Sequence, residues 1–249
     1  MTAISGVIIT KNEEDRIERA IQSLYFVDEI IVLDSQSTDE TVVRARKLGA
    51  TVFVEEWRGF VQQKNRALEL ATGPWIISID ADEWVSPQLA VQLPRILDNA
   101  SHEAFRVPRK NWWGGKVVRF GCFGRDKPVR VFRKASATWA GREPHDSVSV
   151  RGSVGLLTAS LHHAPYRNLA EHLQTIDRYS SLAARALWQE GKRGSVLHVV
   201  LRPCFYFIKD YFVFLGFLEG LRGLLLSLLG SLYVFLKWWK LRGKGCAVS

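Results

Sequence analysis

The first hundred residues repeat one pattern, in which a short β-branched apolar run is followed by a segment with helical spacing. After the first such run, Ile17, Ile21 and Leu24 fall on one side of a helix. Short links between these units favour an α/β fold with a mostly parallel sheet covered by helices. The expected strands are 5–10, 29–34, 51–56 and 75–80, and the expected helices are 12–24, 37–50 and 60–73.

The rest of the chain is organised differently. Residues 105–154 contain short strands interrupted by Gly and Trp, and 168–191 has the pattern of a long amphipathic helix. A chain of 249 residues suffices for one large domain with an appendage. We therefore expect a domain over 1–191, with halves 1–100 and 101–191, and a helical tail over 192–249.

The tail has the composition of a segment at a membrane surface. Its longest uncharged run, 223–236, would span about 21 Å as a helix, short of a hydrocarbon core of roughly 30 Å. The stretch KWWKLRGK (237–244) would place Trp and basic side chains among lipid headgroups. We expect interfacial or shallow re-entrant helices on an anionic membrane. The alternative is a helical hairpin packed on the protein's own core or at a dimer interface.

Charge and cysteine content narrow the setting. The net charge is +9, with an acidic first hundred residues and a basic remainder, so the basic part is expected to meet an anionic partner. The high apolar content of the tail argues against nucleic acid as that partner. The three cysteines are far apart and lack metal-ligand spacing, which favours a reducing compartment over a disulfide scaffold. The N-terminal sequence lacks the pattern of a signal peptide.

Acidic residues follow the expected strand 75–80 directly, in IISIDADEWV. Asp80 and Asp82 can point to the same side of a turn, and their carboxylates are the hard oxygen ligands that Mg²⁺ or Mn²⁺ prefers. Surface turns often carry this pattern, so a metal site is indicated only if polar residues also follow the other strands. Parallel sheets bind their ligands at these carboxyl ends of the strands. Two positions stay open for the side chain of Glu83: behind the metal site, or facing a second substrate.

Four motifs in order supply that support: IITKNEE, LDSQSTDET, QKN and IDADE, all within residues 4–83. Together they resemble the family-two glycosyltransferases, whose GT-A fold is a Rossmann-like, mostly parallel sheet with flanking helices. The resemblance implies a nucleotide-sugar donor, a UDP-sugar in the first instance, and a divalent cation, Mg²⁺ or Mn²⁺, as cofactor. It also assigns 1–100 to the nucleotide sugar and 101–191 to the acceptor.

The same resemblance implies roles for individual residues. Asp34 would accept a hydrogen bond from the base, and Lys64 would reach towards the nucleotide or diphosphate. Asp80 would contact the ribose or the metal, and Asp82 would hold the metal. The nucleotide pocket itself would be lined by Thr10, Asn12 and Glu14.

Later segments narrow the resemblance. EPHDSV (143–148), LHHAPYRNLAEHL (161–173) and the apolar tail look like those of bacterial enzymes that add a sugar, often β-linked glucose, to the heptose of the lipopolysaccharide inner core. This implies a lipid-linked, phosphorylated glycan acceptor and a peripheral or re-entrant location at the cytoplasmic face of the inner membrane. That subgroup more usually has His-Glu where this chain has His145-Asp146.

An inverting transfer needs a base that takes the proton of the acceptor hydroxyl. Asp146 is the expected base and Glu143 its competitor, while His145 would orient the base or close the site. His163 is expected to contact the diphosphate or metal, or else to be a hydrogen-bonded core histidine. Arg130, in the basic middle region, would meet the pyrophosphate or a phosphorylated acceptor.

Two further readings stay open at the level of sequence. The same enzyme class could act on a polyprenyl phosphate or on a capsule or exopolysaccharide acceptor. A non-catalytic, sugar-nucleotide-binding membrane protein would keep the fold without turnover.

Overall fold

The computed structural model describes residues 2–142 and 145–246. The chain divides into two compact units. Unit 1 consists of residues up to 110 together with 127–141 and 145–164, and unit 2 consists mainly of 111–126 and the residues from 165 onward. The second unit thus begins earlier than the tail expected from 192, because the helix before that point packs with the tail helices.

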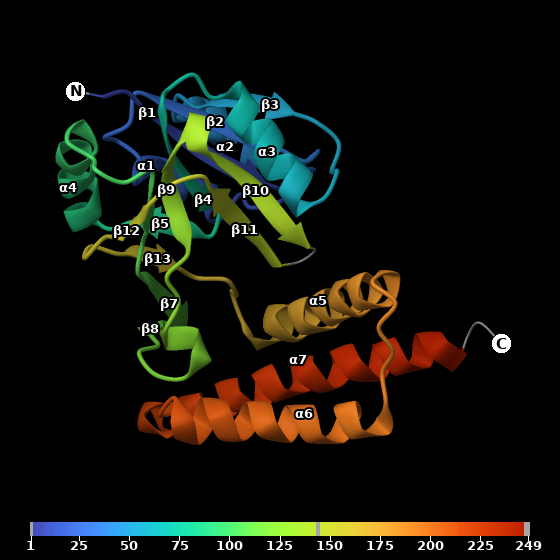
Figure 1. Cartoon of the computed structure of the whole chain (residues 1–249). Coiled ribbons are helices and arrows are strands. Elements are labelled where there is room, and N and C mark those ends of the chain that lie inside the picture. Colours follow the sequence, from blue (N-terminus) through green and yellow to red (C-terminus); the bar gives the residue numbers. More distant parts are fainter. Residues whose placement is uncertain (1, 143–144, 247–249) are drawn as a thin grey trace. The chain divides into compact units, whose positions relative to one another are not determined.

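Unit 1 is built on a seven-stranded sheet with the strand order β12-β6-β9-β4-β1-β2-β3 (Figure 1). The strands β4, β1, β2 and β3 are parallel, and β9 runs antiparallel between β4 and β6. The mostly parallel sheet predicted from the sequence is confirmed. The strand bounds are β1 Ile4–Thr10, β2 Glu29–Asp34, β3 Thr51–Val54, β4 Trp75–Asp80, β6 Ala104–Arg106, β9 Val129–Arg133 and β12 Val154–Leu156.

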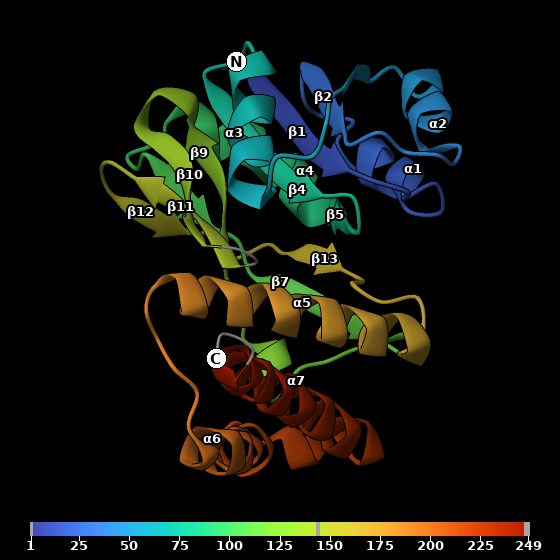
Figure 2. The ribbon, with the colours of Figure 1, turned by 90° about the vertical axis from the view of Figure 1, so that its right-hand side faces the viewer.

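Helices cover both faces of this sheet (Figures 1 and 2). Alternate strand residues point to opposite faces, so Ile8 and Ile77 join one core cluster while Val7 and Ile76 join the other. This two-sided burial explains why the strands are continuous apolar runs. The first face carries α1 (Ile17–Gln22), α2 (Thr41–Lys47) and α4 (Pro87–Asp98), and the second carries α3 (Phe60–Leu70).

Two short strand pairs in unit 1 extend beyond the main sheet. The strand β5 (Glu83–Val85) pairs antiparallel with β13 (Leu161–His163). The strands β10 (Ala137–Arg142) and β11 (His145–Val150) form a two-stranded sheet of their own. These pairs bring residues from distant parts of the sequence to the acidic end of β4.

Unit 2 consists of helices and a short hairpin. The hairpin joins β7 (Arg109–Trp113) to β8 (Lys116–Val117) through Gly114 and Gly115, whose positive φ angles of 57° and 74° favour glycine. The helix α7 (Leu221–Cys246) lies between α5 (Leu169–Gln189) and α6 (Val196–Ile208), as both views show (Figures 1 and 2). A π-helical turn over Lys209–Val213 follows α6 directly.

Carboxylates from the segment between α6 and α7 hold the loop that follows β8. The Oε1 atom of Glu219 accepts the backbone N–H groups of Arg119 (2.6 Å) and Phe120 (3.2 Å). Asp210 accepts the backbone N–H of Cys122. The two acidic residues that break the apolar pattern of the tail therefore serve as partners for backbone donors.

The helix α7 is longer than the uncharged run in its sequence. It contains 26 residues, about 39 Å of helix, and among the described residues it is long and apolar enough to cross a membrane. Helices inside soluble proteins meet the same criterion. One basic residue in it has fixed partners on α5, because the Nζ of Lys240 donates to Asp177, Ser180 and Ser181.

Candidate active site

Three consecutive residues of α3 each fix a different neighbouring element. The Nε2 of Gln63 donates to the Ser35 hydroxyl just after β2 (3.2 Å). Asn65 donates to the carbonyl of Trp139 (2.9 Å) and accepts its N–H (2.8 Å), which ties α3 to β10. Lys64, between them, is therefore held in one orientation at the edge of the sheet.

Lys64 joins two carboxylates that are distant in sequence. Its Nζ lies 3.0 Å from Oδ1 of Asp80 and 2.8 Å from Oδ2 of Asp146, and 4.3 Å from the ring centroid of Trp139. The lysine is only 5% exposed. The structure thus brings together the predicted donor-binding lysine, the first acidic residue of the D-x-D motif and the predicted base.

Arg130 lies on the other side of Asp80. Its Nη2 donates to Oδ2 of Asp80 (2.6 Å) and to Oε1 of Glu83 (2.9 Å), and the side chain is buried. Oε1 of Glu83 also accepts from Arg109 (2.7 Å), and Oε2 accepts the backbone N–H of Asp80 (3.0 Å). Glu83 is 1% exposed. The third acidic residue is therefore placed behind the turn, where it holds the backbone of Asp80 and the two arginines.

The charges in this cluster fix its ionisation. Burial favours a neutral Asp80, but the charges of Arg130 and Lys64 outweigh burial and hold the pKa of Asp80 far below its usual range. Burial likewise favours a neutral Arg130, but Asp80 and Glu83 raise the pKa of its guanidinium further above the ordinary value. Asp80 is thus a carboxylate, and Arg130 a cation, at any pH near neutrality.

Asp82 lies beside His163 because β13 pairs with β5. The backbone N–H of Ala164 donates to the carbonyl of Asp82 (2.9 Å), and Nε2 of His163 lies 3.4 Å from Oδ2 of Asp82. Oδ1 of Asp82 is buried, and no described residue forms a hydrogen bond with it. Burial raises the pKa of Asp82, but the neighbouring imidazole outweighs this and the net shift is downward.

This pair fits a divalent cation. A buried carboxylate oxygen without a hydrogen-bond partner, next to an imidazole nitrogen, offers ligands that Mn²⁺ accepts. Within residues 2–142 and 145–246, no group of three His, Cys, Asp or Glu side chains gathers in a way that could hold a metal. A cation bound by Asp82 and His163 therefore needs further ligands, such as phosphate oxygens or water.

The residues predicted to bind the nucleotide lie at the ends of β1 and β2. Thr10 and Asp34 are neighbours in the register of these strands, and both are buried. Asp34 accepts the backbone N–H of Ser37 (2.8 Å) and also the Ser37 hydroxyl. The Thr10 hydroxyl is buried and has no hydrogen-bond partner within the part of the chain that the structure describes.

Asn12 and Glu14 shape the loop after β2. Asn12 adopts a left-handed conformation (φ 54°), and its Oδ1 accepts the backbone N–H of Thr38 (2.9 Å). Oε2 of Glu14 accepts the backbone N–H of Glu40 (3.0 Å). The left-handed conformation of Asn12, together with hydrogen bonds from the backbone N–H groups of residues 12–14 to side chains of the loop after β2 and the start of α2, keeps this segment out of the helix, so α1 begins at Ile17 and not at residue 12 as the apolar spacing predicts.

Two residues predicted for the site cannot be placed, and two residues that the structure places in the site were not predicted. Glu143 lies outside the described residues, and the structure does not describe the side chain of His145. Arg109 and Trp139 were not singled out from the sequence, although they touch Glu83 and Lys64. A basic residue beside a short strand pair carries no periodic signal, and a lone Trp usually indicates core packing.

Comparison with known proteins decides the family. The sequence model described as Glycosyl transferase family 2 matches residues 5–138, more than half of the chain. The chain belongs to glycosyl transferase family 2. Among relatives of this glycosyltransferase, an uncharacterised glycosyltransferase of Rickettsia felis is 35% identical over 97% of this chain and 90% of its own. The lipopolysaccharide core biosynthesis glycosyltransferase LpsC of Rhizobium meliloti is 31% identical over 94% of this chain and 89% of its own.

Solved structures agree on the fold of the glycosyltransferase. A Staphylococcus aureus TarS structure (residues 1–349) in complex with UDP-GlcNAc has a TM-score of 0.52 at 14% identity, over 98% of this chain and 92% of that one. Glucosyl-3-phosphoglycerate synthase of Mycobacterium tuberculosis, in complex with Mn²⁺, UDP and glucosyl-3-phosphoglycerate, has a TM-score of 0.51 at 21% identity, over 78% and 82%. The family and the GT-A-like fold predicted from the four motifs are confirmed.

Proposed function

We propose that this glycosyltransferase is an inverting, metal-dependent enzyme that moves a hexose, in the first instance glucose, from a UDP-sugar to a heptose hydroxyl of the lipopolysaccharide inner core. The observation that carries the chemistry is the Asp146–Lys64–Asp80 arrangement at the end of β4. The acceptor class is supported by the similarity to LpsC over nearly the whole of both chains.

Asp146 is the proposed general base. Lys64 keeps its carboxylate in place, and the 12% of the side chain that stays exposed is the part that the acceptor hydroxyl would approach. In the transfer, a carboxylate oxygen of Asp146 takes the proton of the acceptor hydroxyl as the hydroxyl oxygen bonds to the anomeric carbon. The bond from that carbon to the diphosphate oxygen breaks at the same time, and its electron pair leaves with UDP.

The donor is proposed to lie along the ends of β1, β2 and β4. Asp34 would receive a hydrogen bond from the base, and Thr10, Asn12 and Glu14 would line the nucleotide pocket. Lys64 and Arg130 offer positive charge to the diphosphate. Asp82 and His163 would hold the divalent cation, with Asp80 beside it on the ribose or metal. The cation, when bound, supplies positive charge that stabilises the departing diphosphate.

The activity is tested by incubating the protein with UDP-sugars, Mg²⁺ or Mn²⁺ and truncated inner-core acceptors, with the new linkage read by NMR. We expect a β-linked product, and we expect Asp146→Asn to lower turnover by roughly 10²–10⁴-fold. Asp98→Asn, which changes an aspartate at the end of α4, is the matched control.

Other outcomes of the same assay would overturn parts of the proposal. Retention of anomeric configuration would exclude the single displacement. Transfer only to a polyprenyl phosphate, or only to a capsule or exopolysaccharide glycan, would show that the inner core is not the acceptor. Full activity of Asp146→Asn would favour a polyprenyl phosphate acceptor, which is already anionic. Binding of UDP without turnover on every acceptor would indicate a non-catalytic protein.

We also propose that unit 2 attaches the enzyme to the cytoplasmic face of the inner membrane. One face of α6 is apolar and more than half exposed along its whole length. Exposed basic residues flank it at Lys192, Arg193, Arg202 and Lys209. An apolar face with a basic border suits the headgroup region of anionic lipid. The face consists of Val196, Leu197, Val200, Leu201, Phe205 and Ile208.

Liposome flotation tests this attachment. The full chain is expected to float with vesicles that contain anionic lipid, and less so at high salt. The double variant Leu197→Gln, Leu201→Gln should lower the bound fraction, whereas Val43→Gln, at an exposed position of α2, should not. A wild-type chain that stays unbound at low salt would contradict the attachment.

A further inference from the structure

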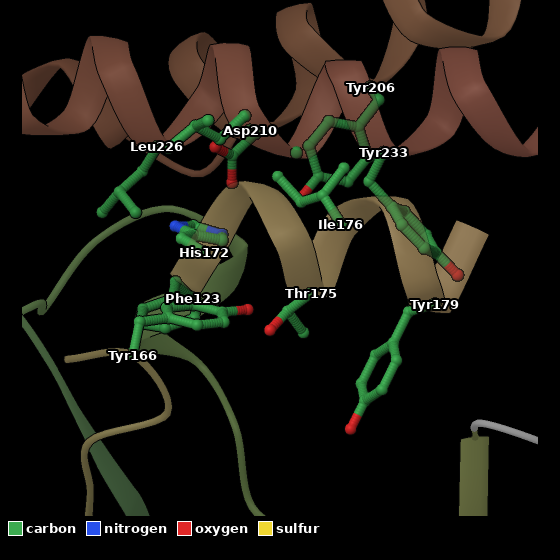
Figure 3. Close-up of a pocket in the computed structure, with 12 residues that line it drawn as sticks. Phe123, Tyr166, His172, Thr175, Ile176, Tyr179, Tyr206, Asp210, Leu226 and Tyr233 are labelled. Carbon is green, nitrogen blue, oxygen red and sulfur yellow. The ribbon is translucent and has the colours of Figure 1, made fainter. Parts of the chain in front are cut away.

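Unit 2 contains a cavity that the proposed transfer does not use. Its volume is about 210 Å³, below the 300–1,000 Å³ typical of sites for drug-sized ligands. Side chains from α5, from α7 and from the segment 206–210 line it (Figure 3). A space of this size suits one ring and not an extended molecule.

Aromatic rings form much of the wall. Tyr166 stacks on His172 with centroids 3.7 Å apart and planes at 11°, and on Phe123 with centroids 6.5 Å apart and planes at 17°. Tyr206 contributes a further ring and a hydroxyl from α6. Flat aromatic surfaces are suited to the C–H faces of another ring.

Hydrogen-bonding groups accompany these rings. Nδ1 of His172 accepts from the indole N–H of Trp113 (3.1 Å), so a neutral imidazole carries its proton on Nε2. Burial lowers the pKa of His172 to about 4, which keeps the ring neutral. Thr175 adds a hydroxyl from the same helix.

Asp210 gives the cavity a buried acceptor. It is 5% exposed and accepts the Ser227 hydroxyl (2.5 Å) as well as the backbone N–H of Cys122. None of the ion pairs among the described residues includes it. In Figure 3 its carboxylate is turned towards α5. A carboxylate has about four acceptor sites, so capacity remains for a further donor.

The mixture of groups discriminates between ligand classes. An alkyl chain would bring no donor to the remaining acceptor site of Asp210 and no polar partner to the hydroxyls of the wall. An anionic ligand would be repelled by Asp210. A pyranose ring presents apolar C–H faces and a rim of hydroxyls, and these match stacked aromatic rings beside a carboxylate acceptor and hydroxyl groups.

We propose that this cavity is a binding site for one neutral sugar ring. Its assignment to a sugar residue of the acceptor glycan, away from the residue that is glycosylated, rests on the proposed function. The site would then add affinity for the acceptor without taking part in the chemistry.

Saturation-transfer NMR on the full chain tests the site. The probes are the methyl glycosides of glucose, mannose and heptose, with octanol and tetramethylammonium as probes of the other ligand classes, all in the presence of excess UDP and Mg²⁺. We expect saturation transfer to sugar ring protons. Tyr206→Phe and Thr175→Val should each weaken it at least fivefold, and Tyr211→Phe, which changes a tyrosine outside the cavity, should leave it unchanged.

Thermal unfolding of each variant checks that it is folded. If one cavity variant does not fold, the other still tests the site. Absence of sugar signals in the wild-type chain would overturn the inference. Sugar signals that persist in both cavity variants would do so too, as would variant-sensitive signals from octanol or tetramethylammonium alone.

Failure of this inference is distinguishable from failure of the proposed function. Asp82→Ala should abolish transfer but leave the saturation signals of the glycosides intact. If the enzyme glycosylates core acceptors while the cavity variants do not change their KM, the sugar site is not part of the acceptor site. If the enzyme transfers only to a lipid phosphate, the glycoside signals alone decide whether the cavity binds a sugar.

Discussion

Glu83→Gln provides a direct test of how the acidic turn is held. Three donors converge on the Glu83 carboxylate: Arg109 at 2.7 Å and Arg130 at 2.9 Å on Oε1, and the N–H of Asp80 at 3.0 Å on Oε2. A carboxamide of the same shape has one oxygen and one NH₂ group. If its oxygen serves the two arginines, its NH₂ group faces the N–H of Asp80, and two donors oppose each other.

The magnitude follows from these bonds. An unsatisfied buried N–H costs about 1–3 kcal/mol, and two hydrogen bonds between charged groups become weaker by about 1 kcal/mol each when the carboxylate charge is removed. We therefore expect the free energy of unfolding to fall by about 3–5 kcal/mol, within the range for a broken buried ion pair. For a chain of this size, that corresponds to a melting temperature lower by roughly 6–20 °C.

Urea unfolding of wild type, Glu83→Gln and Glu103→Gln measures the effect. Glu103 is the matched control, because it also pairs with an arginine, Arg133 at 3.5 Å, but both side chains are 36% exposed. Its loss should cost less than about 1 kcal/mol. Equal and small losses in the two variants would refute the view that burial makes the Glu83 contacts strong.

Three further predictions concern the metal, the lysine and the pH. His163→Ala should weaken Mn²⁺ binding in the presence of UDP at least tenfold by electron paramagnetic resonance, and unchanged binding would remove His163 from the metal site. Lys64→Met should lower kcat/KM about 10²-fold or more, since it removes the cation between Asp80 and Asp146; activity near wild type would contradict its role. Burial holds the pKa of His172 at about 4, below its ordinary 6.5. The neutral ring therefore contributes fully to the free energy of unfolding above about pH 6.5, and this contribution is lost as the pH falls towards 4. It amounts to at most about 2–3 kcal/mol after allowance for solvent screening. In urea unfolding at a series of pH values, His172→Asn should remove most of the change in stability between pH 6.5 and 4.

The sequence predicted the strands well because each is buried on both faces and reads as an apolar run. It predicted the position of Asp80 and Asp82 for the same reason, since polar residues that end such a run lie at the edge of the sheet. The first helix was predicted too long, because the left-handed conformation of Asn12 and the backbone N–H bonds of residues 12–14 to later side chains override the apolar spacing.

Contacts between distant segments were harder to predict. Lys64 and Asp146 meet only because β10 and β11 fold back on α3, and this pairing has no local signal. Glu83 could not be oriented from the sequence, since its direction depends on Arg109 and Arg130 from other strands. The grouping of α5 with the tail was missed for a related reason: an amphipathic helix shows that it has a partner, but not which one.

The discontinuity of unit 2 limits how this enzyme can be shortened. The loop around Arg119, Phe120 and Cys122 relies on the carboxylates of Asp210 and Glu219, which lie 88 to 100 residues later in the chain. A fragment that ends before residue 192 keeps that loop but loses the acceptors for three of its backbone N–H groups, and it exposes the face of α5 that packs on α7. The tail thus belongs to the same compact unit as segment 111–126, and we expect its removal to lower the solubility of the remaining chain.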